Sequence, residues 1–251
     1  MRHFAGFCAA LAALLLFSST GAEAAEKPSV QKTVTIRQLN EAVDVFDSVL
    51  LVETEPHPFR EFLAAQDLSF AENALDIGTG CGVLALIVLK QGAKRVVATD
   101  ILPAAVENAR HNAGKLGLSE KMDVRLVPED SPGAYSIIKD GEKFDLIVSS
   151  PPWDDADPSS VAENQSGISP YNYNDKEHQL LKSLIRGLKA RLTAQGRAWL
   201  YLGRERMVNI AIQTAKEEAL AINLRSPGIL FSGENPDEGV VLYTILELAL
   251  P

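Results

Sequence analysis

The feature that most constrains the fold of this chain is a regular alternation of apolar, strand-like segments with helical segments from residue 73 onward. Strands are expected at 73–77, 95–99, 123–127, 144–149, 197–202 and 240–248. Helices are expected at 59–65, 83–91, 103–116, 177–192 and 205–219. Such an alternation is typical of a mostly parallel sheet with helices on both faces. The sequence therefore predicts a doubly wound α/β fold that binds ligands beyond the carboxyl ends of its strands.

The first 24 residues have the pattern of an export signal. Arg2 and His3 precede an unbroken run of apolar and small residues at 4–17, and Ala22-Glu23-Ala24 forms an A-x-A cleavage site. We expect a mature, exported chain (periplasmic or secreted) of residues 25–251, made of a lead-in at 25–70 and a core at 71–251. An uncleaved segment would instead anchor the chain in a membrane, and a misassigned start would leave it in the cytoplasm.

Charge and length limit the partners of this core. The chain has 33 acidic and 24 basic residues, and its formal net charge is −9. Domains that hold nucleic acid by charge are normally basic, so the balance lowers the expectation of such a partner without excluding a local basic patch. Few residues remain for a separate recognition domain, and no His/Cys/Asp spacing indicates a zinc site.

A glycine-rich turn follows the first expected strand of the core. It reads Asp76-Ile-Gly78-Thr79-Gly80-Cys-Gly82, a G-x-G-x-G spacing that does not match the G-x-G-x-x-G of dinucleotide sites. Glycines let a backbone turn sharply and approach a ligand closely. An acid beside the turn disfavours a pyrophosphate and suits a cation. S-adenosylmethionine, with its sulfonium and ammonium groups, fits this chemistry better than NAD.

A second acid ends the next strand of the core. Asp100 lies 22 residues beyond Gly78, at the position where a carboxylate accepts the two hydroxyls of an adenosine ribose. A simple tight turn with Asp100 near a helix start is the alternative.

These two segments together resemble motifs I and II of class I S-adenosylmethionine-dependent methyltransferases. The resemblance extends over roughly residues 45–205 and implies the seven-stranded, Rossmann-like sheet of that family. It also implies that Asp76 and the loop residues face the methionine part of the cofactor and that Asp100 faces the ribose. Asp130, after the third strand, would lie near the adenine, although a solvated acidic loop explains Glu129 and Asp130 equally well.

The fourth expected strand runs directly into Ser150-Pro151-Pro152-Trp153. Two prolines stiffen the backbone and remove two N–H donors. We expect the Ser150 hydroxyl and the Pro151 carbonyl to accept hydrogen bonds from a planar amide or amino group, and Trp153 to offer a flat face to it. Such contacts would orient a poorly nucleophilic nitrogen toward the sulfonium methyl. A rigid loop without chemistry is the alternative.

The same four residues resemble the (Asn/Asp/Ser)-Pro-Pro-(Tyr/Phe/Trp) signature of methyltransferases that modify amide or amino nitrogens. The segment 52–59 is also similar to the segment that covers the cofactor in the small-methyltransferase and release-factor-glutamine-methyltransferase group. The resemblance implies methylation of a protein glutamine or a nucleobase, and a small amine stays open. Serine replaces the asparagine usual in that group, which leaves the acceptor undecided.

Three further features keep alternatives open. Asp154, Asp155 and Asp157 could bind a polyamine in an aminopropyl transferase of the same fold, or form a solvated loop. Tyr171 and Tyr173 could line an acceptor pocket, and His178 is expected to be a surface or capping residue. The export pattern would also suit a non-enzymatic binding protein with a degenerate methyltransferase fold, because S-adenosylmethionine is made in the cytosol.

Overall fold

The computed structural model describes residues 29–53, 57–160, 168–231 and 240–251. The expected export signal lies outside the described residues. None of the helices in the described ranges is both long and apolar enough to span a membrane.

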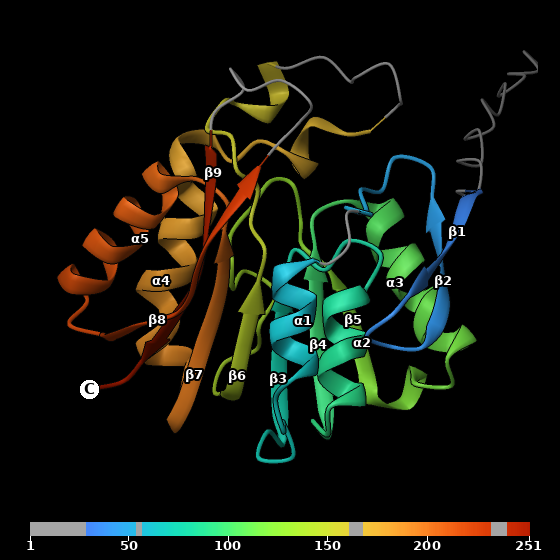
Figure 1. The fold of residues 1–251 in the computed structure, drawn as a ribbon, viewed down its shortest axis with the longest axis horizontal. Helices are drawn as coiled ribbons and strands as arrows, with labels where there is room; N and C mark the ends of the chain where they lie inside the picture. Colours follow the sequence, from blue (N-terminus) through green and yellow to red (C-terminus); the bar gives the residue numbers. More distant parts are fainter. Residues whose placement is uncertain (1–28, 54–56, 161–167, 232–239) are drawn as a thin grey trace, which may run out of the picture.

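A seven-stranded sheet forms the centre of the molecule, in the order β5-β4-β3-β6-β7-β9-β8 (Figure 1). Its strands are β3 (Asn73–Ile77), β4 (Arg95–Asp100), β5 (Met122–Leu126), β6 (Phe144–Ser149), β7 (Leu192–Leu202), β8 (Ala221–Phe231) and β9 (Val240–Ala249). The first five are parallel, and β9 runs antiparallel to both β7 and β8. The predicted doubly wound α/β fold is confirmed.

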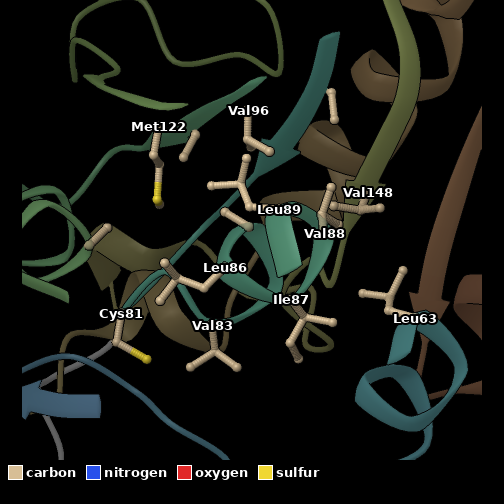
Figure 2. Packing of buried hydrophobic residues seen from close by; sticks show 14 of the residues in the cluster. Leu63, Cys81, Val83, Leu86, Ile87, Val88, Leu89, Val96, Met122 and Val148 are labelled. Carbon is tan, nitrogen blue, oxygen red and sulfur yellow. The ribbon is translucent and has the colours of Figure 1, made fainter. Parts of the chain in front are cut away.

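Helices cover both faces of this sheet (Figure 1). One layer contains α1 (Pro58–Ala64), α2 (Val83–Lys90) and α3 (Pro103–Lys115), and the other contains α4 (Gln179–Arg191) and α5 (Glu205–Glu217). Each layer has its own cluster of buried apolar side chains against the sheet. α2 is apolar on nearly all sides because it lies between the sheet and α1: Figure 2 shows its side chains among Val96 and Val148 of the sheet and Leu63 of α1.

A separate antiparallel hairpin precedes the core. It consists of β1 (Val30–Ile36) and β2 (Glu41–Phe46), and it packs beside α3 (Figure 1). The sequence left 37–52 without an assigned type and did not predict this hairpin. It also did not predict β8.

The long connection between β6 and α4 contains three short 3-10 turns: η2 (Pro158–Ser160), η3 (Pro170–Asn172) and η4 (Lys176–His178). A further turn, η1 (Ser119–Lys121), precedes β5. α4 begins two residues later than expected, because Glu177 and His178 have φ angles of 51° and 54° and cannot continue a helix. His178 was expected to be a surface or capping residue: it is only 2% exposed, so it is not on the surface, but it occupies the N-cap position of α4.

Candidate cofactor and acceptor site

The glycine loop lies across the carboxyl end of the neighbouring strand. The amides of Gly78 and Thr79 both donate to the carbonyl of Thr99 at the end of β4, at 2.9 and 3.0 Å. Gly78 has a φ of 74°, and a Cβ atom built on it would meet nothing within 4 Å. A Cβ on Gly82, whose φ is 88°, would lie 3.2 Å from Ala109 of α3. Gly78 therefore keeps the ligand side open, whereas Gly82 allows the close approach of α3.

Asp76 is fully buried beneath this loop. Its Oδ2 accepts a hydrogen bond of 2.7 Å from the Thr79 hydroxyl, whereas its Oδ1 has no partner among the described residues. Burial raises the pKa of this carboxyl to about 7. A buried acceptor without a donor is costly. Asp76 itself is not among the residues that line the cavity at this edge of the sheet, whereas the next residue, Ile77, is.

Asp100 connects the end of β4 to the same loop. Its Oδ2 accepts from the Gly80 amide at 2.9 Å and its Oδ1 accepts from the Leu102 amide at 3.0 Å. Burial raises its pKa above the ordinary value. Since a carboxylate offers about four lone-pair positions, these two bonds leave acceptor capacity for hydroxyl groups.

The proline segment starts at the end of β6, beside the glycine loop. The Ser149 hydroxyl donates to the Ile77 carbonyl at 2.8 Å and so ties the ends of β6 and β3 together. Ser150 follows immediately, and its hydroxyl has no hydrogen-bond partner in the described ranges. Ser150 and Pro152 line a cavity at this edge of the sheet, whereas Pro151 is buried and is not among the lining residues.

This cavity has a volume of about 490 Å³ and joins the two motifs. Gly78, Thr79, Gly80 and Asp100 line it at one side and Ser150 and Pro152 at another. Its other lining residues fall within 50–60, 77–84, 99–102, 127–133, 157–158 and 171–183. Topology explains the meeting, because the loops after parallel strands all emerge at the same edge.

Trp153 lies away from the cavity lining. Its ring packs on the end of β7, where a Cβ on Gly203 would come within 2.3 Å of it, and its centroid lies 5.8 Å from that of Tyr201. This placement gives no support to the expected flat face for an acceptor. Tyr171 lines the cavity instead, and Tyr173 does not.

The three aspartates that follow Trp153 are each paired with a basic side chain. Asp154 and Asp155 form ion pairs with Arg204 and Arg206, and these pairs hold the loop after β6 against the start of α5. Asp157 lines the cavity and pairs with Lys176 at 2.9 Å, which lowers the pKa of that carboxyl to about 2.

Glu129 and Asp130 are exposed, and neither is among the lining residues of the cavity. This placement gives no support to the implied position of Asp130 near an adenine. No group of three or more His, Cys, Asp or Glu side chains in the described part of the chain is arranged to hold a metal ion.

Sequence reasoning missed many of the lining residues, among them the polar residues Arg60 and Asn172. Arg60 is 2% exposed and donates to the Val52 carbonyl from the buried side of α1. The available signal in the sequence was its position beside Phe59 and one turn before Leu63, which indicates the buried side of the helix. Asn172 bonds to backbone groups of residues 48 and 50, and no local pattern indicates a contact over such a sequence separation.

Comparisons with known proteins find similarity to methyltransferases. Residues 61–150 match the family described as ribosomal protein L11 methyltransferase (PrmA). A ribosomal protein L11 methyltransferase of Geobacter metallireducens is 43% identical over 75 residues, 30% of this chain and 25% of that protein. A release factor glutamine methyltransferase of Chlorobaculum tepidum is 40% identical over 96 residues, 37% of this chain and 32% of that protein. The chain thus spans about a quarter to a third of the length of these relatives.

Solved structures agree on the architecture. A methyltransferase from Pyrococcus furiosus superposes with a TM-score of 0.52 at 22% identity, over 78% of this chain and 83% of that one. The expected resemblance to class I methyltransferases of the small-methyltransferase group is confirmed, and the fold is theirs.

Proposed function

We propose, from this class I methyltransferase fold, that the chain is an S-adenosylmethionine-dependent methyltransferase acting on an amide or amino nitrogen of a planar group. The observation that carries the proposal is the single cavity that Gly78, Asp100 and Ser150 share. A cofactor held by the first two would have its reactive end within reach of an acceptor held by the third.

The residues present fit S-adenosylmethionine. Asp76 does not line the cavity, but it directly precedes the lining residues Ile77 and Gly78, and its Oδ1 has no partner among the described residues. A ligand that reached it past the glycine loop would suit it best with a cationic donor such as the ammonium of the methionine part. The open side of Gly78 admits a ligand against the backbone, and Asp100 has lone pairs left for the ribose hydroxyls. When bound, the cofactor supplies an electrophilic methyl group on its sulfonium.

The chain's own contribution is positioning. The Ser150 hydroxyl and the Pro151 carbonyl would accept the acceptor's N–H groups and fix the direction of its nitrogen. The Ser149 bond to Ile77 keeps these acceptors beside the glycine loop. Trp153, packed on Gly203 and Tyr201, would hold the proline segment in place.

The acceptor class follows from charge and from the relatives. The names of the matched relatives point to proteins as methyl acceptors. A net charge of −9 also disfavours duplex nucleic acid held by charge alone. We therefore rank a protein amide first, with a nucleobase or a small planar amine as the alternatives. Export remains a separate proposal based on the A-x-A pattern.

The aminopropyl alternative has less support. A polyamine site needs carboxylates that are available to amines, whereas Asp154, Asp155 and Asp157 are each paired with an Arg or Lys. A degenerate binding protein would keep the cavity and lose catalysis.

Calorimetry of S-adenosylmethionine with the purified full chain tests the proposal. Wild type and the exposed-site control Asp140→Asn should bind at micromolar concentration, and Asp100→Ala should lose at least tenfold in affinity. Ser150→Ala should retain binding and slow the transfer of labelled methyl groups to extract, in a fraction sensitive to protease. Absence of binding by folded wild type contradicts the proposal, and binding without transfer to protein or RNA favours the degenerate binding protein.

A further inference from the structure

A short strap of residues 47–53 crosses one side of the cavity. It begins in a tight turn after β2, where the Val49 amide donates to the Phe46 carbonyl at 3.2 Å and Ser48 has a φ of 65°. Leu50, Leu51 and Val52 of the strap line the cavity. The Leu50 carbonyl lies 3.7 Å from a Cβ placed on Gly80, so the strap passes directly over the glycine loop.

Asn172, in the loop between β6 and α4, binds this strap. Its Nδ2 donates to the Ser48 carbonyl at 3.2 Å, and its Oδ1 accepts from the Leu50 amide at 3.4 Å. Nδ2 also donates to the Ser169 carbonyl of its own loop at 3.0 Å. One amide side chain therefore joins two walls of the cavity that are more than 120 residues apart in sequence.

The turn that carries Asn172 is itself firmly held. Pro170 begins η3, and its carbonyl accepts from both the amide and the side-chain nitrogen of Asn174, each at 3.0 Å. The loop then closes on the proline segment, since the Asp154 amide donates to the Tyr173 carbonyl at 2.8 Å. The Asn172 amide thus extends from a fixed base toward the strap.

The strap has a conformation that requires support. A left-handed φ at a residue other than glycine is strained, and Ser48 is such a residue. Asn172 contacts the carbonyl of that residue and the amide two positions later, as a neighbouring strand would. Alanine at 172 removes both bonds, and aspartate removes the donor to Ser48.

We propose that Asn172 is a positioning residue that clasps the strap over the bound cofactor and so couples cofactor release to the acceptor loop, by which we mean residues 168–178 before α4. The inference rests on the proposed function for the identity of the ligand. A displaced acceptor loop would withdraw the Asn172 amide, free the strap and open the cavity beside the glycine loop. The rate of cofactor dissociation therefore depends on the position of the acceptor loop.

The first test measures release of S-adenosylhomocysteine, the demethylated cofactor, from the full chain by chasing it with excess S-adenosylmethionine. Asn172→Ala should release it at least tenfold faster than wild type. Tyr173→Ala is the matched control, because Tyr173 adjoins Asn172 in the same loop and does not line the cavity. Its release rate should stay within about twofold of wild type.

The second test needs no ligand. Amide hydrogen exchange of the segment 47–53 should quicken in Asn172→Ala, because the Leu50 N–H loses its acceptor, while the amides of β3 stay protected. Faster release together with this loss of protection supports the clasp. Unchanged release, or faster release with unchanged protection at 47–53, overturns it. If wild type binds neither ligand, the proposed function fails, and unchanged exchange at 47–53 would overturn the clasp independently.

Discussion

At the scale of single residues, Asp76 carries the sharpest conflict between stability and function. The carboxyl is fully buried, and only one of its oxygens has a hydrogen-bond partner among the described residues. Burial disfavours the charged form, so the folded pKa rises from the ordinary 3.8 to about 7. The free protein is therefore stabler with a protonated Asp76, whereas a cationic ligand needs the carboxylate.

The raised pKa of Asp76 makes the free energy of unfolding depend on pH with a definite sign. Between about pH 4 and pH 7 the folded protein holds a proton on Asp76 that the unfolded chain has released, so this group lowers the free energy of unfolding as pH rises. Each pH unit in that window corresponds to about 1.4 kcal/mol. Below that window, Glu142 and Asp157 act oppositely, since ion pairs lower both pKa values to about 2 and their contribution disappears as pH falls.

We therefore predict that Asp76→Asn is more stable than wild type at neutral pH and that its advantage grows with pH. Denaturant unfolding at pH 5 and pH 7 should show the difference between the two proteins increasing by about 2–3 kcal/mol. S-adenosylmethionine affinity should fall at least tenfold in the variant. Asp140→Asn, at an exposed site, is the control. An advantage that does not change with pH would contradict the assignment.

At the scale of elements, the β1–β2 hairpin is joined to the core by two buried asparagines of α3. Asn108 accepts from the Phe46 amide and donates to the Asp44 carbonyl, both at 2.9 Å. Asn112 accepts from the Asp44 amide at 2.9 Å and donates to the Asp44 carbonyl at 2.8 Å. Asn112 alone also donates to the Cys81 carbonyl in the glycine loop, at 2.9 Å.

This difference predicts separable effects of the two asparagines. Asn108→Ala removes the acceptor of the Phe46 amide, and Asn112→Ala removes the acceptor of the Asp44 amide, while the Asp44 carbonyl keeps the other asparagine as a donor. Each variant should lower the free energy of unfolding by about 2–4 kcal/mol. Only Asn112→Ala releases the glycine loop, so we expect it alone to weaken S-adenosylmethionine binding, by about tenfold. Urea unfolding and calorimetry on both variants measure the two effects. Equal losses of affinity would show that the hairpin, and not the Cys81 bond, supports the site.

The same elements explain what the sequence could and could not predict about the fold. The bounds of β3 and β6 agree with prediction because each is a short apolar run ended by glycine or proline. β2 was missed because α3 covers its outer side, so Asp44 and Val43 are both buried and the alternation typical of a surface strand is absent. β8 was missed because it contains Pro227 and Gly228, residues that disfavour a strand.

The candidate site, like the fold, could be predicted from the sequence only in part. Gly78 and Ser150 directly follow parallel strands and Asp100 is the last residue of another, so topology alone predicts that they share one edge of the sheet. Asn172 lies in a long loop, and its partners depend on tertiary contacts that no local period or motif encodes. The orientation of Trp153 was equally hidden, because it depends on the absence of a side chain at Gly203.

At the scale of the whole molecule, the cavity depends on parts of the chain that are distant in sequence. The strap follows the hairpin, the glycine loop follows β3, and the acceptor loop lies between β6 and α4. Two apolar clusters, one on each face of the sheet, support these loops, and Trp153 contacts both clusters. These segments come together only in the native state, so a ligand in the cavity makes contacts that the unfolded chain cannot offer.

Such a ligand should stabilise the fold as a whole. S-adenosylhomocysteine at one hundred times its Kd should add about 2.7 kcal/mol, because it binds the native chain and not the unfolded one. For a chain of this size, that corresponds to a rise in Tm of roughly 5–11 °C. A thermal melt followed by circular dichroism measures it, with Asp100→Ala expected to show less than about 2 °C at the same ligand concentration. A rise confined to a second, minor transition would mean that the hairpin and strap unfold separately from the sheet and that the cavity belongs to a local unit.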